Sequence, residues 1–170
     1  MMGIGMMVAL HSAPAGFFKS SLPHDSSELF SLIRKAFSLG FKCFQVGPLS
    51  NFVEIDGKHL KTVLDQCGME RNAHVGGLYD AEKFALTEEG YRRAQKEIHY
   101  GIKLCREIAS TLVSFHSPFF TTRELEDKAL LSKARTRFLK LVKKEVEFAC
   151  DNGIRMALES FCYPPLSSTV

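Results

Sequence analysis

Three residues that could bind a divalent metal ion stand at or near the ends of three successive strand-like segments. These residues are His74, His116 and Glu159. In β/α barrels the chemistry gathers at the carboxyl ends of the strands, so residues in this position are candidates for one shared site. Two imidazole nitrogens and one carboxylate suit zinc, and also manganese or iron. The sequence therefore predicts a divalent-metal site, with zinc or manganese as the cofactor.

Strand and helix patterns alternate along the whole chain. Apolar, strand-like runs are expected at about residues 4–11, 41–46, 70–75, 111–116 and 154–159. Apolar residues at helical spacing fill the intervals, and Gly40, Gly68 and Gly153 close three of the predicted helices. Five strands separated by four helices predict parallel strands joined by right-handed crossovers.

The strand sequences favour a barrel over an open sheet. The first strand-to-helix turn, at residues 11–17, has no Gly-x-Gly-x-x-Gly, so the dinucleotide-binding fingerprint is missing. Polar or small residues also alternate with apolar ones, as at Asn72 and His74, whereas an open sheet covered on both faces reads more uniformly apolar. The predicted fold class is α/β: a partial (β/α) TIM barrel containing the first five strands of eight. Residues 1–170 are expected to form one incomplete domain, since an ordinary barrel needs about 250 residues.

Composition limits the setting and the partners. A net charge of +3 is too small to indicate nucleic acid by itself. The five cysteines are odd in number and form no Cys-x-x-Cys pair, which argues against a disulfide framework and favours a reducing, cytoplasmic location. The apolar start, Met1–Leu10, lacks the basic residue of a signal peptide. No run reaches the ~18 apolar residues of a membrane span, so no membrane partner is expected.

Short motifs at the strand ends resemble a known superfamily. They are His11-Ser-Ala, Phe44-Gln45, Ala73-His74, Phe115-His116-Ser-Pro and Ala157-Leu-Glu159. In their order and spacing they are similar to xylose-isomerase-like TIM barrels, which include sugar isomerases and epimerases together with endonuclease-IV-type AP endonucleases. The resemblance implies that Glu159 is a metal ligand beside the reacting carbons in the sugar enzymes. It also implies that His74, His116 and Glu159 bind one zinc in the endonucleases.

The leading hypothesis is a divalent-metal-dependent isomerase or epimerase acting on a small sugar or polyol-like substrate, incomplete in this chain. Glu159 is the expected catalytic residue as well as a metal ligand. His11 and Gln45, at the ends of the first two strands, are the expected substrate-binding residues. The expected partner is a small-molecule sugar.

Two alternatives remain open. The first is a metal-dependent AP endonuclease, but the loop at residues 75–78 offers no bulky residue to wedge between bases. The basic run at residues 128–144 falls on a predicted outer helix, where a solvated face is the simpler interpretation. The second alternative is a non-catalytic, truncated fragment. In either case an open barrel edge predicts self-association, because unpaired strand edges pair readily with other chains.

Overall fold

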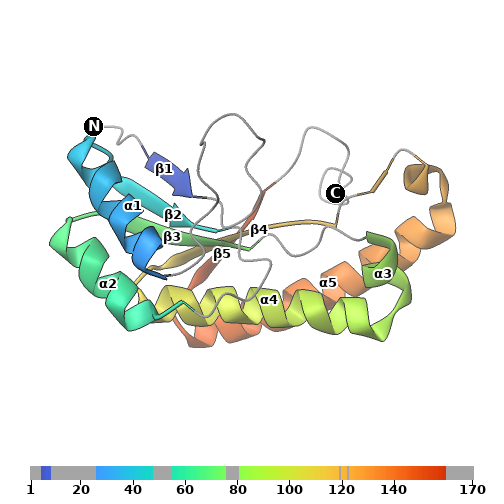
Figure 1. Cartoon of the computed structure of the whole chain (residues 1–170). Coiled ribbons are helices and arrows are strands. Elements are labelled where there is room, and N and C mark those ends of the chain that lie inside the picture. The colour runs from blue at the N-terminus through green and yellow to red at the C-terminus, as the bar shows by residue number, and fades with distance from the viewer. Residues whose placement is uncertain are drawn as a thin grey trace.

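Five parallel strands form one sheet in the computed structural model, which describes residues 5–8, 26–47, 55–75, 81–118, 120–121 and 123–159 (Figure 1). The strands follow chain order, β1-β2-β3-β4-β5. Their bounds are Gly5–Val8, Cys43–Val46, Glu70–Val75, Leu112–His116 and Arg155–Glu159. Every neighbouring pair is parallel. The predicted α/β class and the parallel order are confirmed.

Five α-helices and one 3-10 helix lie between these strands in the described part of the chain. They are α1 Ser26–Ser38, α2 Gly57–Gln66, α3 Ala81–Leu86, α4 Glu88–Glu107, η1 Glu124–Glu126 and α5 Lys128–Asp151. Side-chain caps fix where the two longest begin: Thr87 accepts a hydrogen bond from the Gly90 amide, and Asp127 accepts from the Ala129 and Leu130 amides. The sequence pattern did not predict α3, because six residues are too few to show helical periodicity.

The two faces of the sheet differ in chemistry. Phe44, Val46, Ala73, Val113 and Phe115 are buried in the main apolar core, together with residues of the helices. Figure 1 shows the long helices α4 and α5 along this side of the sheet. The strand residues that alternate with these core residues point to the opposite face of the sheet, because successive side chains of a strand point to opposite faces. That second face is polar near the ends of β2 to β5, as barrel-lining strands require.

The sheet is open among the described residues. Each of β1 and β5 pairs with a single neighbouring strand, so the five strands form part of a barrel wall rather than a closed cylinder. Leu158 on β5 is 42% exposed, although it faces the same side as the apolar core residues of β4. Within the described residues, none of the helices has the length and apolar character that crossing a membrane requires.

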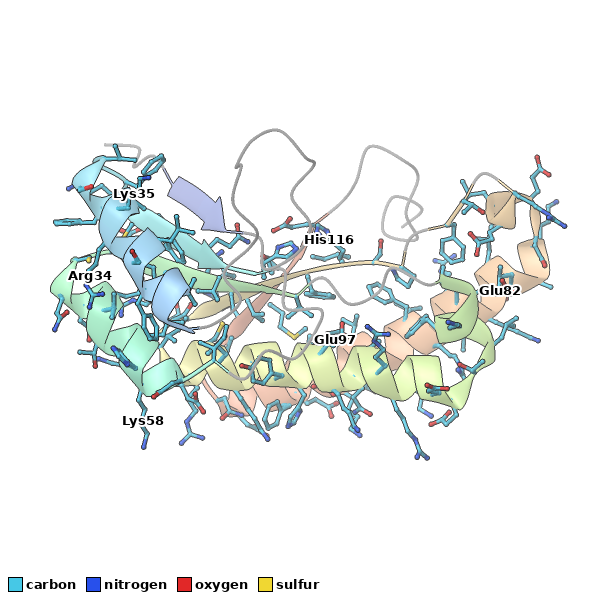
Figure 2. All side chains as sticks on the ribbon, in the orientation of Figure 1. Arg34, Lys35, Lys58, Glu82, Glu97 and His116 are labelled. Carbon is cyan, nitrogen blue, oxygen red and sulfur yellow. The ribbon has the colours of Figure 1, made fainter. Side chains whose placement is uncertain are left out.

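One buried carboxylate is incompletely paired within this core. Glu97 of α4 is fully buried, between α4 and the sheet (Figure 2). Its Oε1 accepts from Arg93 Nε at 3.1 Å, but Oε2 has no hydrogen-bond partner among the described residues. Burial raises the pKa of Glu97, and the hydrogen bond from Arg93 only partly opposes this effect.

We expect Glu97→Gln to stabilise the protein at pH 8 by about 1 kcal/mol, because it removes a buried and half-paired charge. A raised folded-state pKa means that the stability contributed by protonated Glu97 is present at low pH and is lost as pH rises through that pKa. Urea unfolding at pH 5 and pH 8 measures both effects, and Glu97→Gln should lose less stability between them than the parent. Glu89→Gln, an exposed position on the same helix, is the control. A Glu97→Gln protein less stable than the parent at pH 8 contradicts the prediction.

Candidate metal centre

The three predicted ligands come together because they lie on adjacent parallel strands. His116 and Glu159 are direct partners in the register of β4 and β5, and His74 of β3 pairs with Ser114 of β4. Ser114 and His116 are two residues apart, so they share one face of the sheet. Figure 2 shows His116 on the face opposite the long helices. The three side chains therefore occupy one face and one end of the sheet.

Their spacing fits a single divalent ion. His74 Nδ1 lies 3.3 Å from Glu159 Oε1, and His116 Nε2 lies 3.8 Å from Glu159 Oε2. The candidate ligand atoms, one from each residue, all lie within 4.8 Å of one another. A tetrahedral zinc ion with bonds of ~2.1 Å holds its donors ~3.4 Å apart, so only small side-chain adjustments would be needed. The donor set and its geometry both fit the cofactor predicted from the sequence.

Burial prepares the two histidines for a ligand role. His74 and His116 are 3% and 8% exposed, and their rings meet edge to face with centroids 4.4 Å apart. Desolvation lowers the pKa of His74 below 6.5, against the opposing pull of Glu159. Desolvation and the neighbouring His74 lower the pKa of His116, again opposed by Glu159. Both rings thus favour the neutral form, whose lone pair a metal ion requires.

Two polar residues support His74 from the neighbouring strands. Gln45 Nε2 donates to Ser114 Oγ at 2.9 Å and lies 3.2 Å from His74 Nδ1. Ser114 Oγ lies 3.0 Å from the same imidazole nitrogen. Gln45, predicted as a substrate-binding residue, therefore lies within the cluster. Ser114 was not predicted, although its two-residue spacing from His116 placed it on the same face.

The remaining histidines divide between packing positions and undescribed segments. His11, the other predicted substrate-binding residue, lies outside the described residues, as does His24. The ring of His59 stacks on Phe30, and the ring of His99 stacks on Phe148. The basic run at residues 128–144 lies on α5, which packs against β5 from the helical side of the sheet.

The chain is similar to known proteins in structure, but it has no match among family models or curated sequences. Among solved structures, D-psicose 3-epimerase with D-tagatose from Clostridium cellulolyticum H10 is similar over 94% of this chain and 53% of its own, with 16% identity and a TM-score of 0.66.

Two further structures contain metal ions. The IolI protein with a zinc atom is similar over 92% of this chain and 51% of its own, with 12% identity and a TM-score of 0.58. A xylose-isomerase-like TIM barrel protein from Mycobacterium smegmatis, in complex with magnesium, matches 82% of this chain and 48% of its own, with 19% identity and a TM-score of 0.54.

These similarities define the fold of the chain. It has the fold of the xylose-isomerase-like TIM barrels, and the predicted resemblance is confirmed at that level. The chain spans about half the length of these solved proteins, which is consistent with a partial barrel.

Proposed function

We propose that this chain carries part of the active site of a cytoplasmic, divalent-metal-dependent isomerase or epimerase that acts on a small sugar or polyol-like substrate. The observation that carries the proposal is the convergence of His74, His116 and Glu159 on the polar face of the sheet. We further propose that residues 1–170 act as one incomplete barrel domain, with the opposite wall of the site supplied by additional chain.

Each residue of the site has a role that its position supports. His74 and His116 are buried nitrogen donors, and their lowered pKa values favour the neutral form that binds the ion. Glu159 is 44% exposed, so one carboxylate can face both the ion and a substrate in the open part of the barrel. When bound, zinc or manganese would polarise a substrate carbonyl and acidify the adjacent C–H.

Glu159 is also the proposed proton acceptor. A carboxylate works as a general base when it lies within hydrogen-bond reach of the proton that it removes. The half-exposed position of Glu159 permits such an approach, whereas the buried histidines are less accessible to a substrate. Gln45, which contacts His74 and Ser114, and His11 are the proposed contacts to substrate hydroxyl groups.

The similar structures support this choice of chemistry. D-psicose 3-epimerase contains D-tagatose, and a D-allulose 3-epimerase from Methylomonas sp. contains D-allulose. The IolI structure contains zinc. A sugar substrate and a divalent ion are therefore the first ligands to test with this chain.

A proton-exchange experiment tests the proposal without requiring full turnover. The chain is incubated with D-tagatose and manganese or zinc in deuterated water, and NMR follows the proton on the carbon next to the carbonyl. We expect slow, metal-dependent exchange, because the described residues form only one wall of the site. Glu159→Gln or a chelator should abolish it, while Glu147→Gln on the exposed face of α5 should not. Exchange that is unchanged by the chelator and by Glu159→Gln would contradict the proposal.

AP endonuclease activity is the second candidate, and one observation favours it. The two histidines and the glutamate converge as the resemblance to the endonucleases implies, with all three ligands drawn from β3, β4 and β5. A duplex DNA containing an abasic site is the discriminating substrate. Efficient metal-dependent nicking, abolished by Glu159→Gln, would place this function ahead of sugar chemistry. If the chain binds no metal and acts on neither substrate, the non-catalytic alternative stands.

The open sheet leads to a prediction about assembly. We expect the 170-residue chain to self-associate, since β1 and β5 each leave one edge unpaired among the described residues. Leu158→Lys should shift light scattering toward the monomer, because a lysine on an edge strand disfavours pairing. Leu139→Lys, at an apolar position on α5 that is 57% exposed, should have no such effect. A stable monomer in the parent chain that retains stoichiometric metal through dialysis contradicts this prediction.

A further inference from the structure

A second group of charged side chains lies on α4, away from the candidate metal centre. The centre occupies the polar face of the sheet, whereas α4 and α5 cover the opposite face (Figure 1). On the outer surface of α4 there is a groove of about 560 Å³. Its lining among the described residues is Arg92, Gln95, Lys96, His99, Tyr100 and Lys103. A volume of this size is that of a small-molecule site.

The charge of this groove is strongly one-sided. Lys96, His99 and Lys103 are spaced three and four residues apart, so they stand on one face of the helix. No acidic side chain contributes to the lining that the structure describes. Arg92 pairs with Glu88, but Lys96 and Lys103 have no ion-pair partner among the described residues. Two uncompensated ammonium groups thus flank one imidazole.

The imidazole between them is held in place by buried groups. Glu145 of α5 is 1% exposed, and its Oε2 lies 3.2 Å from His99 Nδ1. Gln95 Nε2 donates to the other carboxylate oxygen at 2.9 Å. The ring of His99 stacks on Phe148 with centroids 3.8 Å apart. A buried carboxylate therefore orients His99, and Nε2 is the ring nitrogen left to meet a ligand in the groove.

We propose that this groove binds a small phosphorylated ligand, with the phosphate between Lys96, His99 and Lys103. A phosphate monoester carries a charge of about −1.5 to −2 near neutral pH and presents three acceptor oxygens. This charge matches two ammonium groups, which donate to the phosphate oxygens. Nε2 of His99 donates to a further oxygen when the ring carries a second proton, since Nδ1–H is the donor to Glu145. A carboxylate carries a single charge and would leave one lysine uncompensated. The site is independent of the proposed sugar chemistry at Glu159.

Binding of inorganic pyrophosphate and inorganic phosphate to the intact 170-residue chain is the test. NMR follows the imidazole C–H signal of His99, which the variant His99→Gln assigns. We expect a saturable shift, and we expect Lys96→Gln combined with Lys103→Gln to weaken binding about tenfold or more, since two charge-assisted contacts are lost. Both lysines are exposed, so the double variant should fold normally. Glu145→Gln should weaken binding while retaining the charge of both lysines.

The control is a second pair of exposed lysines, Lys140→Gln with Lys143→Gln on α5, which do not line the groove. This pair should leave the affinity unchanged. If both double variants weaken binding equally, general charge attraction explains the affinity and the proposal is overturned. The absence of a saturable shift would do the same. Duplex DNA is the last arm: if it binds more tightly than pyrophosphate and depends equally on the α5 lysines, the surface is a nucleic-acid surface and the proposed small-ligand site is wrong.

Discussion

Replacing Glu159 with glutamine is expected to reduce zinc or manganese affinity on the order of 100-fold or more. The substitution keeps the size of the side chain and removes the only negative charge among the three converging ligands. Loss of an outer-shell partner alone typically weakens metal binding by 10–100-fold, so loss of a ligand should reach or exceed the upper end of that range. Equilibrium dialysis with metal analysis measures the effect directly.

The control and the supporting variants follow from the same geometry. Glu147→Gln removes an exposed carboxylate from α5 and should leave affinity unchanged. Ser114→Ala should cause a smaller loss than Glu159→Gln, since Ser114 contacts His74 without being one of the three ligands. Retention of parental affinity by Glu159→Gln would mean that the cluster is a hydrogen-bonded structural feature of the barrel interior.

Much of the fold was predictable because each element carries a local signal. Glycine or asparagine-glycine endings marked the helices, and alternation of polar with apolar residues marked the barrel-lining strands. The sequence also placed His74, His116 and Glu159 at strand ends, from which a parallel order brings them together. Local patterns suffice for this, together with the rule that parallel strands present their carboxyl ends at one edge of the sheet.

What the sequence could not predict depends on contacts between distant segments. Helix α3 is too short to show a period, and it is held by packing of Ala85 against Leu130 and Ala134 of α5. Ser114 becomes part of the candidate site through a register that pairs it with His74, forty positions earlier. The His99–Glu145 pair likewise joins two helices across the same range of sequence separation. No local pattern in the sequence specifies such pairings.

Metal affinity is expected to stay nearly constant from pH 8 to about pH 6.5 and to fall steeply in more acidic solution. A metal ion binds the neutral form of histidine, so protons compete with it only when the imidazoles become charged. Burial lowers the pKa of both His74 and His116 below the ordinary 6.5, which moves this competition toward lower pH. Once the pH is below both lowered values, two protons must leave for one ion to bind. The affinity should then fall by up to ~100-fold per pH unit, following a slope of two protons.

The lowered pKa values of His74 and His116 also predict how the stability of the metal-free protein changes with pH. A histidine whose pKa is lowered by folding takes up its proton more readily in the unfolded chain, so unfolding is favoured as pH falls from 6.5 through the lowered folded-state values. Glu159 opposes both shifts, and Glu159→Gln should therefore lower the two pKa values further. Zinc dissociation constants measured across pH 5 to 8, with NMR titration of the two imidazoles in the metal-free chain, separate these effects. A loss of affinity of about threefold or more between pH 7.5 and 6.5, the loss expected for two histidines with the ordinary pKa of 6.5, would show that the histidines titrate like exposed ones. Burial would then not be what prepares them for the ion.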